Sequence, residues 1–128
     1  MKIKMICCAV SFLLIATALA PDARAEEADM RLLAYAIENA AGGESYTVMV
    51  SLGAVLLNRL TSEAYPSSLG AVIADAGIDI SKVEPSSRAL RAAADASGGF
   101  DPTGGALHYK SSEYEGEAAL ATDSWFFY

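Results

Sequence analysis

Few residues in this chain can do nucleophilic or metal chemistry. The chain holds one histidine, His108, and two cysteines, Cys7 and Cys8, which lie in an apolar run near its N-terminus. A zinc site with one histidine and no cysteine beside it would depend on carboxylates, which is rare for structural zinc. We therefore predict no metal and no cofactor, and the sixteen Asp and Glu residues remain as candidates for proton transfer.

The first 25 residues have the pattern of a secretory signal peptide. Lys2 and Lys4 precede an apolar run over residues 5–20, which is shorter than the roughly 20 apolar residues that a spanning helix needs. The run is followed by Ala23-Arg24-Ala25, a small-x-small cleavage pattern. We predict cleavage after Ala25, with an uncleaved N-terminal anchor as the alternative. Both place the domain outside the cytoplasm, in the periplasm, the cell wall or the extracellular space.

The remaining residues, 26–128, form one predicted domain with a strongly acidic balance. They include six basic and fifteen acidic residues, a net charge of −9. This charge excludes nucleic acid as a partner, because binding to phosphates needs a basic surface. The hydrophobic content of 53% excludes a disordered acidic tail. We expect a monomer with no disulfide, since both cysteines precede residue 26, and no membrane span once the signal peptide is removed.

Apolar residues recur at helical spacing in four segments, and capping residues mark their ends. We predict helices over residues 28–41, over residues 45–59, from Ser67 or Ser68 through Ile73, and from Ser86 or Ser87 to Ser97. The second is apolar almost all round, which is typical of a buried central helix. Residues 106–109 and 124–128 are predicted strands. The expected fold class is α+β, mostly helical, with a small antiparallel β-sheet.

Polar residues near two helix ends have predicted structural roles. Asn58 and Arg59 close the central helix, where an amide can bond loop carbonyls and a cation suits the helix dipole. Arg91 and Asp95 are four residues apart in the last helix, which is the spacing of a surface ion pair.

Four sequence clusters carry a family resemblance. They are Leu33–Ile37 with Gly43-Glu44-Ser45-Tyr46, Gly53–Arg59 with Tyr65-Pro66, Phe100–Tyr109, and Trp125–Tyr128. In order and spacing they resemble the SleB-type cell wall hydrolases, named for the spore cortex-lytic enzyme, over essentially all of residues 26–128. The Asp-Pro-Thr-Gly-Gly-Ala run at residues 101–106 is the most specific piece.

The resemblance implies a lysozyme-like fold that cleaves the glycan strands of peptidoglycan as a lytic transglycosylase. In that chemistry a carboxylic acid protonates the glycosidic oxygen, and a hydroxyl of the sugar closes an anhydro ring. One carboxyl group suffices, whereas ordinary glycosidases use two. We therefore predict an exported peptidoglycan hydrolase.

The chain departs from the family at the expected acid. The family's Glu-Ala-Arg-Gly-Glu run ends on Glu44, which places its first glutamate, the implied catalytic acid, on Ala40 and its arginine on Gly42. Glu38 lies about 200° around the helix from position 40 and is expected to be solvated. Glu44 is therefore the predicted catalytic residue. The alternatives are that its carboxylate only orders the start of the central helix, or that another carboxylate such as Asp79 is the acid.

Six residues are predicted to bind the substrate: Thr47, Asp101, Thr103, His108, Tyr109 and Trp125. Each has a structural alternative. The Thr47 hydroxyl, like that of Ser51 one turn later, can bond back to its own helix, and Asp101 can form a turn that fixes the Gly-Gly corner. His108 and the aromatic residues can pack in the sheet, and their alternation leaves open which face is buried.

Two functions follow from the resemblance. The domain cleaves glycan strands with an activity weakened by the change at Ala40, or it is an inactive relative that binds glycan strands or a partner cell-wall protein. A third possibility is an acidic helical adaptor with a filled groove. The family's usual histidine before the last strand is replaced by Ser124, and its Asn-Pro after the first strand by Lys110-Ser111. If the domain binds sugars, we expect a groove lined by Glu44, Thr47 and residues 103–109.

Overall fold

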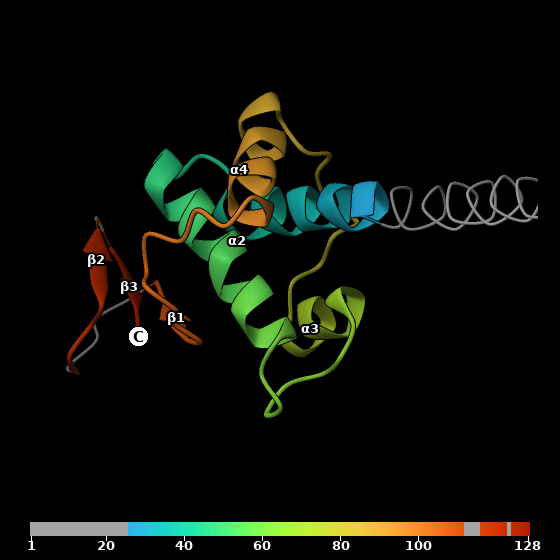
Figure 1. Cartoon of the computed structure of the whole chain (residues 1–128). Coiled ribbons are helices and arrows are strands. Elements are labelled where there is room, and N and C mark those ends of the chain that lie inside the picture. Colours follow the sequence, from blue (N-terminus) through green and yellow to red (C-terminus); the bar gives the residue numbers. More distant parts are fainter. Residues whose placement is uncertain (1–25, 112–115, 123) are drawn as a thin grey trace, which may run out of the picture.

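The computed structural model describes residues 26–111, 116–122 and 124–128, so the predicted signal peptide lies outside the described residues. The described chain forms four helices followed by a three-stranded sheet (Figure 1). The helices cover residues 26–41, α2 (Tyr46–Leu60), α3 (Leu69–Asp75) and α4 (Ser87–Ser97). None of them is long and apolar enough to cross a membrane. The predicted fold class is confirmed.

The central helix is α2, as predicted. Every residue from Val48 to Leu56 is buried, because neighbours cover the helix on all sides. Gly53 permits a close helix crossing, since an added Cβ would lie 2.9 Å from Ile37 Cδ1 and 3.3 Å from Ala96 Cβ. Figure 1 shows α2 running between α4 and the sheet toward α3. The first helix and α4 therefore meet on α2, and the sheet is attached to it separately.

Serine side chains begin three of the helices, and the structure decides between the predicted alternatives. Ser45 Oγ accepts from the Val48 amide, Ser68 Oγ from the Ala71 amide, and Ser86 Oγ from the Ala89 amide. Such caps satisfy amides that have no partner within the helix. The inner face of α4 consists of alanines 89, 92, 93 and 96, and their small size allows this helix to pack tightly.

The sheet is antiparallel with the order β1-β3-β2, from β1 (Tyr109–Lys110), β2 (Leu120–Thr122) and β3 (Trp125–Phe127). The sequence predicts β1 and β3 and misses β2, because the alanine-rich stretch before β2 lacks clear alternation. The first strand also starts later than predicted. Trp125 and Phe127 face the core, which resolves the question of which aromatic set is buried.

The Ser51 hydroxyl is buried in the middle of α2 and has no hydrogen-bond partner among the described residues. Replacing Ser51 with alanine removes an unpaired polar group and raises helix propensity. We expect Ser51→Ala to increase the free energy of unfolding by about 1 kcal/mol. Urea unfolding measures it, with Thr47→Ala, an exposed hydroxyl on the same helix, as the matched control. A clear loss of stability in Ser51→Ala would contradict this reading.

Candidate functional site

Glu44 lies just before α2, and its carboxylate is free of hydrogen bonds and ion pairs within the described residues. The residue is half-buried, and its backbone is held in place. The Glu44 amide donates to the Ala41 carbonyl at 3.1 Å, and its carbonyl accepts from Arg88 Nη2 at 3.5 Å. The loop therefore fixes the position of Glu44 while leaving its acid group available.

Neighbouring carboxylates are engaged in the fold. Glu38 is half-buried, and its Oε1 accepts from the Ser86 amide at 2.9 Å, so the prediction that Glu38 is solvated is wrong. The Asp95 carboxylate accepts from the Tyr46 hydroxyl. Both carboxylates therefore have structural partners that a proton donor would have to give up.

Asp79 is poorly suited to be the acid. Its Oδ1 accepts from the Ser81 hydroxyl at 2.6 Å and from the Ser81 amide at 2.9 Å. These two hydrogen bonds hold the pKa of the exposed Asp79 carboxyl below its usual value. A general acid of this kind needs a raised pKa, so the shift has the wrong direction.

The end of the first helix has no room for a side chain at position 42. Gly42 lies against Glu38, and a Cβ at position 42 would overlap both the backbone carbonyl and the carboxylate of Glu38. Ala40, two residues earlier, is half-buried and packs against the core. The glycine thus lets Glu38 fold back over the helix end and reach the start of α4.

Tyr46 connects the start of α2 to α4. Its hydroxyl donates to Asp95 Oδ2, and the Arg91 guanidinium carbon lies 5.8 Å from the centre of its ring. Burial raises the pKa of Tyr46, and so do the hydrogen bond and the negative charge of Asp95, while Arg91 and Arg88 act in the opposite direction. The predicted Arg91–Asp95 pair is replaced by this contact. Sequence spacing could not reveal it, because 49 residues separate Tyr46 from Asp95.

Asp101 organises the tight corner at residues 101–106. Its Oδ1 accepts from the amide and hydroxyl of Thr103 at 2.8 and 2.6 Å. Its Oδ2 accepts from the Gly105 amide at 2.8 Å and from Asn58 Nδ2 at 3.0 Å. Gly104 and Gly105 have φ angles of 64° and 99°, a region that favours glycine. The predicted turn at the Gly-Gly corner is confirmed.

The polar groups of the corner are used internally. Thr103 is only 3% exposed, and its hydroxyl also accepts from the Ala106 amide at 3.1 Å. Partial burial raises the pKa of the Asp101 carboxyl, but its four hydrogen bonds outweigh this effect and hold the pKa below the usual value of 3.8. Asp101 and Thr103 therefore shape the corner and have little capacity left for direct contact with a sugar.

The end of α2 joins the corner to the sheet, as predicted for Asn58 and Arg59. Asn58 Nδ2 donates to the Ala106 carbonyl at 3.0 Å, and Arg59 Nε donates to the Leu107 carbonyl at 2.7 Å. The Arg59 guanidinium carbon lies 4.9 Å from the Tyr65 ring centre and 5.4 Å from that of Tyr109. Arg59 thus fastens two loops and a strand to the helix.

Aromatic rings continue from this point across the sheet. The Tyr109 and Trp125 rings stack at 6.0 Å, and burial raises the pKa of Tyr109 against the effect of Arg59. Trp125 is 7% exposed and belongs to the core. His108 is exposed, stacks on Tyr128 at 5.2 Å, and has its Nδ1 3.5 Å from the Tyr65 hydroxyl. Of the predicted aromatic contacts, His108 is the most accessible.

The structure places the predicted site residues at the two ends of α2. Glu44 and the exposed Thr47 lie at the start of α2, whereas residues 101–109 contact its end. From Tyr46 to Asn58 the helix rises about 18 Å along its axis. Three surface hollows border the first helix, and none of the three is lined by Glu44, Thr47 or residues 101–109. The predicted residues therefore form two separate surface regions, and a single groove that joins them stays a prediction.

We expect Asp101→Asn to lower the free energy of unfolding by about 1–3 kcal/mol at neutral pH, because one amide oxygen cannot serve four donors. A depressed carboxyl pKa contributes stability above the unfolded-state pKa, and this contribution is lost as pH falls through the folded-state pKa. The difference from wild type should therefore hold above about pH 5 and shrink below about pH 4. Urea unfolding across this range measures it.

The matched control is Asp75→Asn, which makes the same charge change at an exposed residue at the end of α3. It should shift stability by less than about 0.5 kcal/mol at each pH. Equal effects of the two substitutions would contradict the structural role of Asp101.

Comparison with known proteins places this arrangement in a family. Residues 43–126 match the family model described as Cell Wall Hydrolase. Spore cortex-lytic enzymes of Bacillus cereus and Bacillus subtilis (strain 168) are 35% and 37% identical to this chain over 106 residues, or 76% of it. The chain spans only 38% and 32% of the length of these two enzymes.

Two solved structures have a similar fold. The catalytic domain of the Bacillus cereus SleB protein has a TM-score of 0.64 and 30% identity, over 77% of this chain and 88% of that one. The catalytic domain of the germination-specific lytic transglycosylase SleB from Bacillus anthracis has a TM-score of 0.56 and 36% identity, over 65% and 73%. Sequence and fold agree, and this chain belongs to the cell wall hydrolase family.

Proposed function

We propose that this protein cleaves the glycan strands of peptidoglycan as an exported lytic transglycosylase. The observation that carries the proposal is the family match over residues 43–126, in a chain whose fold is similar to the SleB catalytic domain. Action outside the cytoplasm follows from the substrate class. We assign residues 1–25 to a signal peptide cleaved after Ala25, on the sequence pattern alone.

In the proposed reaction Glu44 is the proton donor. Its carboxyl group protonates the glycosidic oxygen, the bond from that oxygen to the muramic acid anomeric carbon breaks, and a hydroxyl of the same sugar closes the anhydro ring. The ring hydroxyl loses a proton as the ring closes, and this restores the Glu44 carboxyl. The half-buried position of Glu44 and its carboxylate without a described partner favour it over Glu38, Asp79 and Asp95.

The remaining predicted site residues divide into two roles. Thr47, exposed on the first turn of α2, and His108, exposed on the sheet, are proposed to contact sugars directly. Tyr109 is half-buried at the edge of the same aromatic group. Asp101, Thr103 and Trp125 are proposed to act indirectly, by holding the corner and the sheet.

Glu44→Gln keeps the size of the side chain and removes the proton that the reaction needs. We expect it to lower the release of soluble muropeptides from purified sacculi by at least about a hundredfold. Counting anhydro ends in the released material identifies the product. Glu63→Gln, an exposed glutamate after the end of α2, is the matched control and should retain wild-type activity. Equal release by wild type and Glu44→Gln would reject Glu44 as the acid.

The second candidate function is binding of glycan strands without cleavage. The observation that favours it is Ala40, which stands where the family resemblance places the catalytic glutamate. A domain that has lost its acid can keep the surfaces that recognise sugars. Under this alternative the protein sediments with sacculi but produces no new anhydro ends.

Ala40→Glu separates the two candidates. Ala40 is only half-buried, so a glutamate can extend toward solvent from the end of the first helix without entering the core. If the domain is a binding protein that lost its acid, the variant should gain lytic activity over an inactive wild type. Gly42 must be kept, because any side chain there overlaps Glu38. Ala40→Gln is the control, since it has the same shape and no acidic proton.

A further inference from the structure

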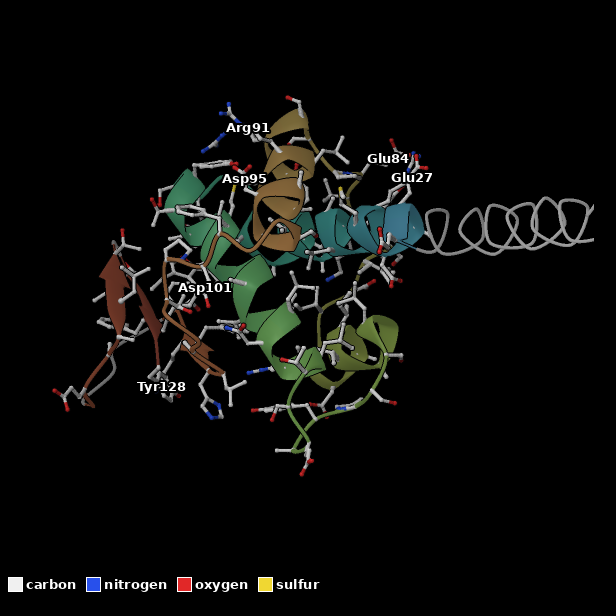
Figure 2. All side chains as sticks on the ribbon, viewed as in Figure 1. Glu27, Glu84, Arg91, Asp95, Asp101 and Tyr128 are labelled. Atoms are coloured by element: carbon white, nitrogen blue, oxygen red, sulfur yellow. The ribbon has the colours of Figure 1, made fainter. Side chains whose placement is uncertain are left out.

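Two arginines of α4 lie beside the proposed acid. Arg88 Nη2 is 3.5 Å from the Glu44 carbonyl oxygen, and the Arg91 guanidinium carbon is 5.8 Å from the Tyr46 ring centre. Both arginines are exposed, and Figure 2 shows Arg91 projecting from α4 at the edge of the molecule, beyond Asp95. Two guanidinium groups of α4 therefore lie at the start of α2, one against Glu44 and the other against Tyr46.

Neither arginine is neutralised by a carboxylate within the part of the chain that is described. Asp95 is one turn from Arg91, but its carboxylate accepts from the Tyr46 hydroxyl. Glu44 offers Arg88 its backbone carbonyl and keeps its carboxylate apart. Residues 26–128 hold fifteen acidic residues and six basic ones, so a position where two cations lie side by side is favourable ground for an anionic ligand in an otherwise acidic domain.

The charges of the two arginines both act on Tyr46. Both lower the pKa of Tyr46, against the larger raising effects of burial and of Asp95. Arg88 and Arg91 are three residues apart in α4, a spacing that puts their side chains on the same face of the helix, so both can act on one ligand at the start of α2. The carboxylate of Asp95, on the same helix, is occupied by the Tyr46 hydroxyl.

We propose that Arg88 and Arg91 bind a free carboxylate of the peptide stem that peptidoglycan glycan strands carry. This inference rests on the proposed function. The stem is attached to the muramic acid, one of the two sugars at the bond to be cleaved, so a strand held at Glu44 brings its stem to the neighbouring surface, where Arg88 and Arg91 lie. Guanidinium groups bind carboxylates through paired hydrogen bonds, which also fix orientation. The pair thus selects strands that bear stems.

The test compares strands with and without stems. Soluble glycan strands are prepared from sacculi freed of phosphate-containing polymers, and half are stripped of peptide by an amidase. Dissociation constants are measured in the Glu44→Gln background, which keeps the strands intact. We expect roughly tenfold tighter binding to stem-bearing strands, lost in the Arg88→Gln, Arg91→Gln double variant. The preference should also weaken with added salt.

Two further variants make the result specific. Arg31→Gln with Lys82→Gln makes the same change in net charge at exposed residues outside this cluster, and it should keep the preference. Arg88→Lys with Arg91→Lys keeps the charge without the planar fork, so it should retain part of the preference. This lysine pair also guards against a glutamine variant that fails to fold.

The outcomes separate this inference from the proposed function. Equal affinity for both kinds of strand, or a preference that survives in the double glutamine variant, overturns the role of the arginines even if the wild-type protein cleaves sacculi. A stem preference in a wild-type protein that releases no anhydro ends supports the inference and rejects the cleavage function.

Discussion

The structure depends on the burial of α2. A helix covered on every side from Val48 to Leu56 has no solvent face of its own, so its two ends must carry the polar contacts with the rest of the domain. At its start, Ser45 caps the helix and Tyr46 reaches Asp95. At its end, Asn58 and Arg59 bind the corner and the sheet through side chains. The helix thereby separates two polar regions by its own length.

This separation determines how chemistry is distributed over the domain. The Asp101 carboxylate at one end is held ionised by four donors, which suits a structural anchor and opposes a role as proton donor. At the other end, Glu44 has a fixed backbone and an unengaged carboxylate. A locked acid group therefore lies beside one end of α2 and an available one beside the other. A polymer such as a glycan strand can contact both regions, whereas a small ligand cannot.

Much of the fold could be predicted from the sequence. The apolar run of α2, the serines before three helices and the Asp-Pro-Thr-Gly-Gly corner each depend on local physics, and local patterns identify them. Strand β2 was missed because its stability comes from pairing with β3, which the short segment Leu120–Thr122 does not reveal. The separation of the predicted site residues by the length of α2 could not be predicted for a related reason, since the path of the chain between distant motifs is a tertiary property.

Long-range polar partners were the hardest part of the candidate site to predict. Glu38 binds the start of α4, and Asp95 binds Tyr46, although helix geometry predicted a solvated glutamate and an arginine pair. In both cases a partner about 50 residues away in sequence competes successfully with a local one. The helical spacing of charged residues therefore predicted their helices correctly. It did not predict which atoms their side chains bind.

The contact between Gly42 and Glu38 also limits how this sequence can change. With Glu38 folded over position 42, acquiring an arginine there would be harmful until the helix end and the Glu38 side chain had moved. The half-buried position 40 has no such obstacle, so the two positions differ in tolerance although they lie in the same turn. The order of mutations therefore decides which sequences can be reached.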